Sequence, residues 1–535
     1  MPSSDCYPID VAPGQSRLFL DYCAADSAVR PFYPSLPRET LWQQRCPRPD
    51  HWSEIVDLLA LQNSSPSAAA SIAALRAGAA TVLTGQQVGL FGGPLYTPFK
   101  AASALARARQ ASAAGHPHVA IFWLATEDHD FAEINHVSFP SRKELRKLLY
   151  SKAPSAPIPV GNVVIDETIE PLIDQAWELL GSSDAMDALV AAYKPGRTFG
   201  RAFAEFYSKA FAAQGLLILD ASSAEIHRLG SPVLKAAIER AGEFNAALLE
   251  RNKALEAAGY HAQVAVTSDS SLLFLLDERT GARLSLKRIP ASAAEPHDLW
   301  QAGRERFTTA DLLGILAAEP QRISPAALLR PIFQDYLLGT SLIIGGPSEI
   351  AYFAQSAVLY ERILGRITAA EPRFSATLIE PAIGELLHKH DLGIDRVFRE
   401  SADSLAQLLA ARSMPIEGKQ MLSAAGNALD AELQTLLDYM RAMDPGLGRS
   451  AETAASKMRY QMNRLRRLAA NFEMQREGSF RRHADAIERA LNPGSVLQER
   501  VHGAAYYLAR CGFSLAETLT ELAFDPCPGH KAIWL

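Results

Sequence analysis

The chain carries two dense blocks of polar residues that could do chemistry, and each directly follows an apolar run. Residues 85–94 read GQQVGLFGGP, and residues 127–130 read EDHD. Glycines let backbone N–H groups approach an anion closely, and the amides of Gln86 and Gln87 add further donors and acceptors. Three carboxylates beside a histidine could bind an ammonium group, hold a metal or move a proton. The two blocks favour an enzyme over a scaffold.

The elements that must position these blocks form a predicted β-α-β unit. Apolar runs at 80–83 and 119–124 are predicted strands, and 97–114 has the pattern of a helix. Both blocks then lie at the carboxyl ends of strands, where open α/β sheets bind ligands. Further strands are predicted at 216–219, 341–344 and 367–370. Strands that alternate with helices predict an α/β fold with a doubly wound parallel sheet.

The glycine-rich block suits an anion, although it matches neither a Walker A sequence nor a GxGxxG fingerprint. A helix that opens near Pro94 or Thr97 would add the positive end of its dipole. Lys100 falls in the first turn of that helix, so it either extends into solvent or is held for an anionic ligand. We expect the ligand, a phosphate or carboxylate. The alternative is a tight turn with glycines for steric reasons alone.

The acidic block has two interpretations. On an extended strand end, Asp128 and Asp130 would face one way and Glu127 and His129 the other. Mutual repulsion would then raise carboxylate pKa values unless cations are bound.

If the segment is helical, His129, Glu133 and His136 would share a face and could bind a divalent metal. This spacing matches no metal motif, so we expect no metal ligands here. Asn135 and His136 could instead serve only to hydrogen-bond within the fold.

Two later blocks have the same character. Residues 345–349, GGPSE, again place glycines and one acid after a buried strand, and the alternative is a turn capped by Ser348. Residues 497–500, LQER, follow an Asn-Pro-Gly turn and by themselves would indicate only the start of an amphipathic helix.

Length and composition bound the other possibilities. The 535 residues exceed what one core usually holds, and a net charge of −6 argues against a nucleic-acid partner. No apolar run approaches the ~20 residues of a membrane span, and the N-terminus lacks a signal-peptide pattern. Five widely spread cysteines indicate free thiols and a cytoplasmic location.

The C-terminal third changes character. Apolar residues step by four and three on both sides of a Pro-Gly turn, which predicts two long antiparallel coiled-coil helices and a homodimer through them. These positions are Leu429, Leu433, Leu436, Met440 and Met443, then Ala451, Ala455, Met458, Met462, Leu465, Ala469 and Phe472. Upstream, residues 1–65 are expected to form an arm packed on the core, 262–267 a strand, and 272–276 with 283–289 a hairpin.

The ordered set of blocks resembles the cysteine-adding enzymes of bacillithiol biosynthesis. The matching segments are 84–97 with Lys100, 122–125, 127–131, 133–136, 329–331, 334–337, 345–347, 349–352 and 497–500. The resemblance implies a Rossmann-type, nucleotidyltransferase-like core in 1–385, with insertions at 150–213 and 225–325. It also implies a dimerising coiled-coil domain at 386–490 and a return to the core at 491–535. The His-Ile-Gly-His signature of related synthetases is absent.

The implied reaction is the last step of bacillithiol synthesis, in which the cysteine carboxyl group is joined to the amine of glucosaminyl-malate. ATP is the expected activator, although no residue shows it, and nothing indicates whether a metal takes part. The predicted catalytic residues are His129, Asp128, Asp130 and Lys100. The predicted binding residues are Gly85, Gln86, Gln87, Gly89, Gly92, Gly93, Pro94, Tyr96, Glu127, Asn135, His136, Gly345, Gly346, Glu349, Gln498, Glu499 and Arg500.

Two alternatives stay open from the residues alone. One is a metal-dependent hydrolase or nucleotidyltransferase that acts on a small sugar or nucleotide. The other is a non-catalytic coiled-coil partner protein, which the polar strand ends argue against because a scaffold has no need of buried carboxylates.

Overall fold

A computed structural model describes residues 2–291, 298–476, 478–525 and 527–535. The chain divides into two compact units. The first comprises residues 1–377 and 498–533, and the second comprises residues 378–497 and 534–535.

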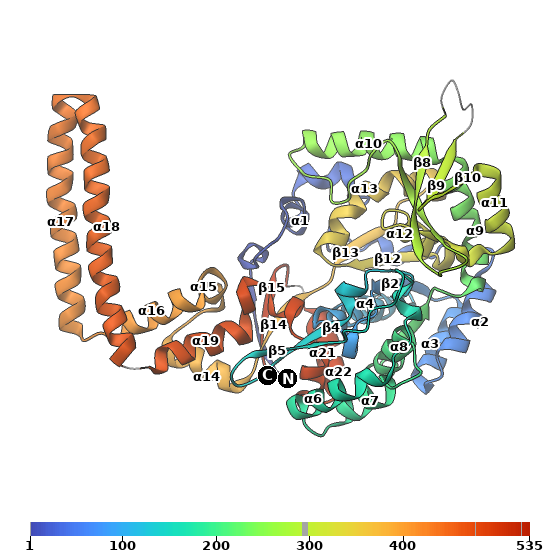
Figure 1. The fold of residues 1–535 in the computed structure, drawn as a ribbon, viewed down its shortest axis with the longest axis horizontal. Helices are drawn as coiled ribbons and strands as arrows, with labels where there is room; N and C mark the ends of the chain where they lie inside the picture. The colour runs from blue at the N-terminus through green and yellow to red at the C-terminus, as the bar shows by residue number, and fades with distance from the viewer. Residues whose placement is uncertain (1, 292–297, 477, 526) are drawn as a thin grey trace. The chain divides into compact units, whose positions relative to one another are not determined.

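The first unit is built on a five-stranded parallel sheet with the order β13-β12-β2-β3-β6 (Figure 1). The strands are β2 Ala80–Gln86, β3 His118–Leu124, β6 Leu217–Asp220, β12 Thr340–Gly345 and β13 Ala369–Pro372. Every strand predicted for this sheet is present, and the prediction of a parallel α/β sheet is confirmed. The apolar runs are continuous rather than alternating because both faces of such a sheet are buried.

Helices cover both faces of this sheet. Phe122 packs on Tyr207 of α8 Phe199–Ala210, whereas the next residue, Trp123, packs on Phe333 of α12 Arg330–Leu338. Neighbouring residues of a strand point to opposite faces, so α8 and α12 lie on opposite sides. The crossover helices are α4 Tyr96–Ala113, between β2 and β3, and α13 Pro347–Leu364, between β12 and β13.

The remaining elements of the first unit surround this core. The N-terminal segment holds β1 Ser3–Tyr7, α1 Arg17–Cys23, α2 Trp52–Gln62 and α3 Pro66–Ala77. Between β3 and β6 lie α5 Phe131–Ile134, β4 His136–Pro140, β5 Leu145–Leu149, α6 Glu170–Leu180 and α7 Asp184–Ala192, followed by α8. Between β6 and β12 lie α9 Ala224–Glu239, α10 Ala241–Ala257, β7 Ser270–Leu276, β8 Arg283–Ile289, β9 Leu299–Ala302, β10 Glu305–Thr308, α11 Thr309–Ala318 and β11 Ile323–Pro325, followed by α12. The unit ends with α20 Gln498–Val501, α21 Ala504–Cys511, α22 Ser514–Phe524 and β15 His530–Trp534, whose last residue falls in the second unit.

One predicted strand, 262–267, is absent from this described region. The side chain of Gln355 takes the place of a strand partner. Its Oε1 accepts from the Val264 N–H at 2.9 Å, and its Nε2 donates to the Val264 carbonyl at 2.8 Å. The backbone is therefore satisfied without a sheet, a solution that an apolar run does not reveal.

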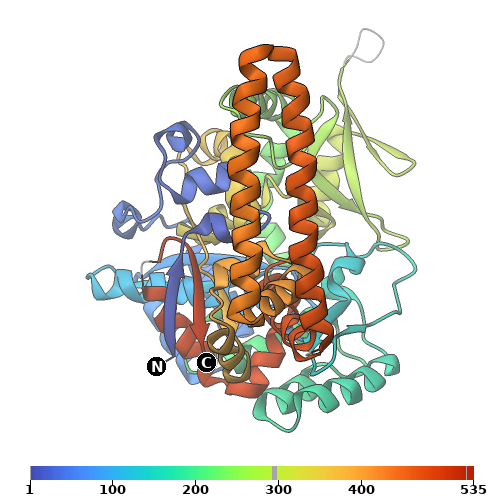
Figure 2. The same ribbon diagram turned by 90° about the vertical axis from the view of Figure 1, so that its left-hand side faces the viewer.

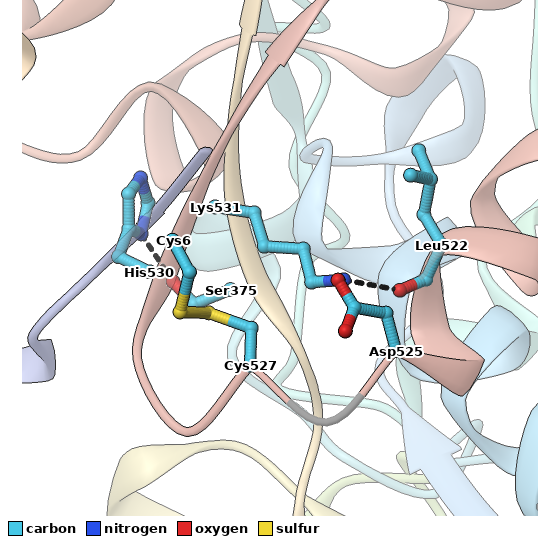
Figure 3. Close-up of a disulfide and its surroundings, with 7 residues drawn as sticks. All are labelled: Cys6, Ser375, Leu522, Asp525, Cys527, His530 and Lys531. Atoms are coloured by element: carbon cyan, nitrogen blue, oxygen red, sulfur yellow. Dashed lines mark hydrogen bonds and ion pairs between the residues drawn. A yellow bond between two sulfur atoms is a disulfide. The ribbon is translucent and has the colours of Figure 1, made fainter. Parts of the chain in front are cut away.

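The prediction that all five cysteines are free thiols is wrong. Cys6 and Cys527 form a disulfide across a sequence separation of 521 residues (Figure 3). The bond is explained by the sheet order β1-β15-β14, which places the N-terminal strand beside the C-terminal one. Nearby, Lys531 Nζ lies 2.9 Å from Asp525 Oδ2, and Ser375 Oγ lies 2.8 Å from His530 Nδ1. Cys23, Cys46 and Cys511 are not disulfide-bonded.

The second unit is helical, and its two longest helices lie side by side (Figure 2). Its helices are α14 Pro381–His390, α15 Ile394–Arg399, α16 Ala402–Ser413, α17 Ile416–Met443, α18 Pro445–Arg476 and α19 Ser479–Leu491. Strand β14, Ser375–Ile379, spans the residue limit between the units. None of the helices in the described parts of the chain is both long and apolar enough to cross a membrane.

The coiled-coil hairpin is confirmed, but its buried seam differs from the predicted one. Leu433, Leu437 and Ala455 form its core, with Leu429 and Ala451 packed against them. The pattern was ambiguous because Leu436 and Leu437 are both apolar neighbours, and only one of them can face the partner helix. Several predicted seam residues are instead exposed: Leu436, Met443, Met458, Leu465 and Phe472.

Candidate functional site

A cavity of about 390 Å³ opens where the strand order of the parallel sheet reverses, between β2 and β12. We call it the switch-point cavity. Gly85, Gln86 and Gln87 line it from the end of β2, Asp128 from beyond β3 and Gly346 from beyond β12. Ligands of doubly wound sheets bind in this crevice, outside the carboxyl ends of the strands. The sheet therefore brings together three of the four blocks predicted from sequence.

Lys100 lies at the floor of this cavity but is not a free cation. It is buried, its Nζ donates to the Gly85 carbonyl at 2.7 Å, and it forms an ion pair with Glu349. Burial lowers the pKa of Lys100, and Glu349 opposes that shift. Glu349 also accepts from the Gly346 N–H at 2.6 Å. The pair thus ties the β2 loop to the β12 loop, an arrangement that neither predicted role for Lys100 anticipated.

Asp128 is the carboxylate of the acidic block that faces the cavity. It accepts from Gln87 Nε2 at 2.6 Å, and Gln87 also donates to Glu133 at 3.1 Å. Burial alone would raise the pKa of Asp128, but Arg330, the hydrogen bond from Gln87 and then Arg283 outweigh burial and lower it. Asp128 is therefore ionised at neutral pH and suited to bind an ammonium group.

Three arginines, together with the paired Lys100, supply the positive charge of the switch-point cavity. Arg330 and Arg500 line it, and within the described residues neither makes an ion pair with a carboxylate. Arg373 also lines it but is held by a bidentate pair with Glu499, at 2.6 and 3.1 Å. Guanidinium groups without a protein partner suit a carboxylate or a phosphate. Of these three arginines, only Arg500 was among the predicted site residues.

Glu127 faces away from the cavity into a buried ion pair. Its Oε1 lies 2.6 Å from His227 Nε2, and His227 Nδ1 lies 2.9 Å from the Ile323 carbonyl. Both ring nitrogens face acceptors, so the ring carries both protons. Burial would lower the pKa of His227, but Glu127 outweighs it and raises that pKa. Burial would likewise raise the pKa of Glu127, and His227 lowers it instead.

His129 and Asp130 lie at the margin of the site. His129 Nδ1 lies 3.3 Å from Arg283 Nη1, and burial followed by Arg283 lowers the His129 pKa, so the ring is neutral at pH 7. Asp130 is exposed and caps α5 by accepting from the Glu133 N–H at 3.2 Å. The alternation expected for an extended strand is wrong because β3 ends at Leu124 and the chain turns.

The glycine-rich loop is held tightly by the protein itself. The Gly92 N–H donates to the Tyr193 hydroxyl at 3.0 Å, and the Gly93 N–H donates to the Leu90 carbonyl at 3.0 Å. Gly92 has φ +83°, and a Cβ there would lie 2.7 Å from Phe206. Glycine is thus required by the turn and by close packing. These two N–H groups are already used within the protein.

The other predicted residues fall into three groups. Those that line a second, adjacent cavity of about 380 Å³ are Gln86, Gln87, Gly89, Gly93, Pro94, Tyr96, His136 and Arg500. Those buried behind the cavity walls are Gly92, Glu127, Gly345, Gln498 and Glu499. Asn135 lines neither cavity, and its Oδ1 lies 3.3 Å from His136 Nδ1.

A metal centre finds no support in the parts of the chain that the structure describes, where no three His, Cys, Asp or Glu residues gather as a metal site. The helical triad of His129, Glu133 and His136 does not form, because α5 ends at Ile134 and His136 begins β4.

Four residues line the switch-point cavity but were not among the predicted site residues: Arg330, Arg373, Gln334 and Tyr352. Arg330 and Gln334 lie in segments that carry the family resemblance, which was a usable signal. Arg373 has no such signal. It enters the site because the Arg373 N–H donates to the Gly345 carbonyl at 2.8 Å, beyond the end of β13.

Comparison with known families agrees with this architecture. Residues 5–373 match the model of the bacillithiol biosynthesis BshC N-terminal Rossmann-like domain, and residues 376–535 match that of the BshC C-terminal coiled-coil domain. Three curated relatives carry the name "Putative cysteine ligase BshC". The relative from Koribacter versatilis is 40% identical over 99% of both chains. The relative from Solibacter usitatus is 33% identical over 97% of this chain and 98% of its own, and that from Salinibacter ruber is 30% identical over 96% of each.

The resemblance drawn from the ordered blocks is therefore confirmed. Both halves of the chain match, and the match covers nearly the full length of these relatives. The chain belongs to the bacillithiol biosynthesis BshC family.

Proposed function

We propose that this protein is a ligase that joins the carboxyl group of cysteine to the amine of glucosaminyl-malate, the last step of bacillithiol synthesis. One observation carries the proposal: the switch-point cavity holds an ionised Asp128 together with Arg330 and Arg500, neither of which forms an ion pair with a carboxylate among the described residues. Cysteine carries an ammonium and a carboxylate, and the cavity offers a partner for each. Family membership and the names of the relatives support the same reaction.

In this proposal Asp128 binds the ammonium group and Arg330 binds the carboxylate. Asp128 is fixed before substrate arrives, since Gln87 holds it, and Arg330 is presented at the start of α12. Fixed charges of this kind stabilise developing charge without reorganisation. The Lys100–Glu349 pair keeps the two strand-end loops in register and does not contact the substrate directly.

The amine of the second substrate must lose a proton to form an amide. His129 is the proposed acceptor because its lowered pKa leaves the ring neutral at pH 7 and its Nδ1 lies 3.8 Å from Asp128 Oδ1. Asp128 is the weaker base of the two, because a carboxylate has a lower ordinary pKa than an imidazole and that of Asp128 is lowered further.

ATP is the proposed activator. Arg330, which would hold the cysteine carboxylate, has the planar donor geometry that also suits a phosphoryl group on that carboxylate, so the residues present fit an activated cysteine. The N–H groups of Gly92 and Gly93 do not, because they already donate within the protein. ATP would supply the free energy that makes amide formation favourable.

Two further proposals follow from the family. We propose that the protein works in the cytoplasm and that it dimerises through the coiled-coil hairpin. The exposed Met458, Leu465 and Phe472 support the dimer because their seven-residue spacing on α18 forms an apolar stripe that a second helix can cover.

The test is purified protein incubated with cysteine and glucosaminyl-malate, with and without ATP, followed by mass spectrometry. We expect a product with the summed mass of the two substrates less one water, formed only with ATP. Failure to form it under any condition, with correctly folded protein, would refute the substrate assignment.

A further inference from the structure

A second cavity of about 380 Å³ adjoins the switch-point cavity, and no comparison assigns it a ligand. The two cavities share five lining residues, which we call the partition: Gln86, Gln87, Tyr96, Glu133 and Arg500. The partition is polar and internally bonded. Gln86 Nε2 donates to the Tyr96 hydroxyl at 3.2 Å, and Gln87 Nε2 donates to Glu133 at 3.1 Å. Two ligands, one in each cavity, would therefore contact the same ordered set of side chains.

The two cavities differ in the charges that they present. The switch-point cavity is lined by Asp128, Glu133 and Glu349 together with four basic side chains. The second cavity has one permanently charged cation, Arg500, and one carboxylate, Glu133. Burial and then Lys147 lower the pKa of His136, so this ring is neutral at pH 7 and can donate one hydrogen bond and accept another.

The rest of the second cavity is uncharged, with apolar walls from Pro94, Ile134, Val137 and Val501 beside its polar groups. Ser138 adds a hydroxyl, and Gln86 and Gln87 add amides. Gly89 and Gly93 have no side chains, so backbone forms part of the wall. Hydroxyls, amides and backbone beside a single guanidinium suit a molecule with many hydroxyls and an acidic group. They offer less to a zwitterionic amino acid than the switch-point cavity does, because Arg500 and Glu133 line both cavities and the switch-point cavity adds Asp128 and Arg330.

We propose that the second cavity binds the amine substrate, a hexosamine that carries a carboxylic acid, while cysteine occupies the switch-point cavity. Arg500 binds the acid at the partition, and the amine reaches the cysteine carboxyl group past Gln87 and Asp128. The new C–N bond forms there, the bond from the carboxyl carbon to the oxygen that carries the ATP-derived group breaks, that oxygen leaves with the group, and the amine loses one proton. This assignment rests on the proposed function, and it divides the site into one chamber for each substrate.

The volume agrees with this division. A cavity of about 380 Å³ falls within the ~300–1,000 Å³ typical of small-molecule sites. The switch-point cavity, at about 390 Å³, lies in the same range and would then hold cysteine.

The experiment blocks each chamber separately. Ser138 lines only the second cavity and Ser348 lines only the first, so Ser138→Leu and Ser348→Leu are matched variants. The Kd for glucosaminyl-malate is measured by calorimetry without nucleotide, and KM for cysteine is measured in the full reaction. We expect Ser138→Leu to weaken glucosaminyl-malate binding at least 10-fold and to leave KM for cysteine within twofold. Ser348→Leu should leave the sugar-acid Kd within twofold and raise KM for cysteine.

Each result decides the matter. Sugar-acid binding that survives Ser138→Leu, or that is lost with Ser348→Leu instead, overturns the chamber assignment but not the ligase. A wild-type protein that neither binds glucosaminyl-malate nor makes product overturns the proposed function and the assignment with it. His136→Gln keeps a polar group of similar size and serves if Ser138→Leu does not fold, with the same loss of sugar-acid affinity expected.

Discussion

The strand-end site and the coiled-coil hairpin handle charge in opposite ways. Around the switch-point cavity, charged groups such as Glu127, Lys100 and Glu499 are buried and individually paired. In the hairpin, pairs such as Arg441 with Glu452 are exposed, and large apolar side chains are exposed with them. Buried pairs cost desolvation and are retained for position, whereas exposed pairs contribute little. The first region therefore fixes charged groups in position, whereas the exposed apolar side chains of the second support the proposal that it associates with another chain.

The largest effect on activity is expected when an arginine without an ion-pair partner is removed from the switch-point cavity. We expect Arg330→Ala to lower kcat/KM about 100-fold, since it removes a charged hydrogen-bond donor from the substrate carboxylate. Arg304→Ala is the matched control, because Arg304 is exposed and lines neither cavity. The assay is product formation by mass spectrometry. Equal losses in both variants would contradict the role of Arg330.

The second test removes one partner of a buried pair. Glu127→Gln should lower the free energy of unfolding by about 3 kcal/mol, because it leaves a buried imidazolium without its counter-ion. Glu144→Gln removes an exposed carboxylate that lies 3.5 Å from Arg146, and it should cause no resolvable change. Urea denaturation measures both. A Glu127→Gln protein as stable as wild type would show that the pair is not needed for the fold.

The same pair predicts a pH dependence of stability. The raised pKa of His227 gives stability that is full below the ordinary histidine value of 6.5 and is lost as pH rises through the folded pKa. The lowered pKa of Glu127 gives stability that is full above 4.5 and is lost as pH falls through its folded pKa. The stability difference between wild type and His227→Gln should therefore be largest between pH 4.5 and 6.5 and smaller at pH 9. A difference that grows up to pH 9 would contradict the charged pair.

The smallest effect on catalysis is expected in the hairpin. Met458→Glu combined with Leu465→Glu places two charges on its exposed apolar face and should convert a dimer into a monomer. kcat/KM should stay within twofold, because neither residue lines a cavity. Lys457→Glu, an exposed neighbour, should leave the dimer intact. Light scattering after size exclusion gives the mass, and a double variant that stays dimeric would place the interface elsewhere.

Local patterns predicted what depends on neighbours in sequence. The buried runs before Gly85 and before the acidic block gave β2 and β3, and the 4-3 repeat gave the hairpin. The pairing of Lys100 with Glu349 could not be predicted, because it depends on β2 and β12 being adjacent across some 250 residues of chain.

The other contacts that were not predicted also join residues far apart in sequence. Glu127 meets His227 only through the placement of α9, and Cys6 meets Cys527 only through the pairing of the terminal strands. Spacing along the chain carries no information on such contacts. The ordered family blocks carry it indirectly, because they identify segments that form one site. Arg330 lies in one of the segments that carry the family resemblance, and Arg373 does not.

The most direct test of the account is a crystal structure with cysteine and glucosaminyl-malate bound in the absence of nucleotide. We expect the cysteine ammonium to lie within hydrogen-bonding distance of Asp128 and the cysteine carboxylate to contact Arg330. We expect the sugar acid to lie in the second cavity, on the other side of Gln86, Gln87 and Tyr96. Cysteine bound outside the switch-point cavity, with that cavity filled by solvent alone, would contradict it.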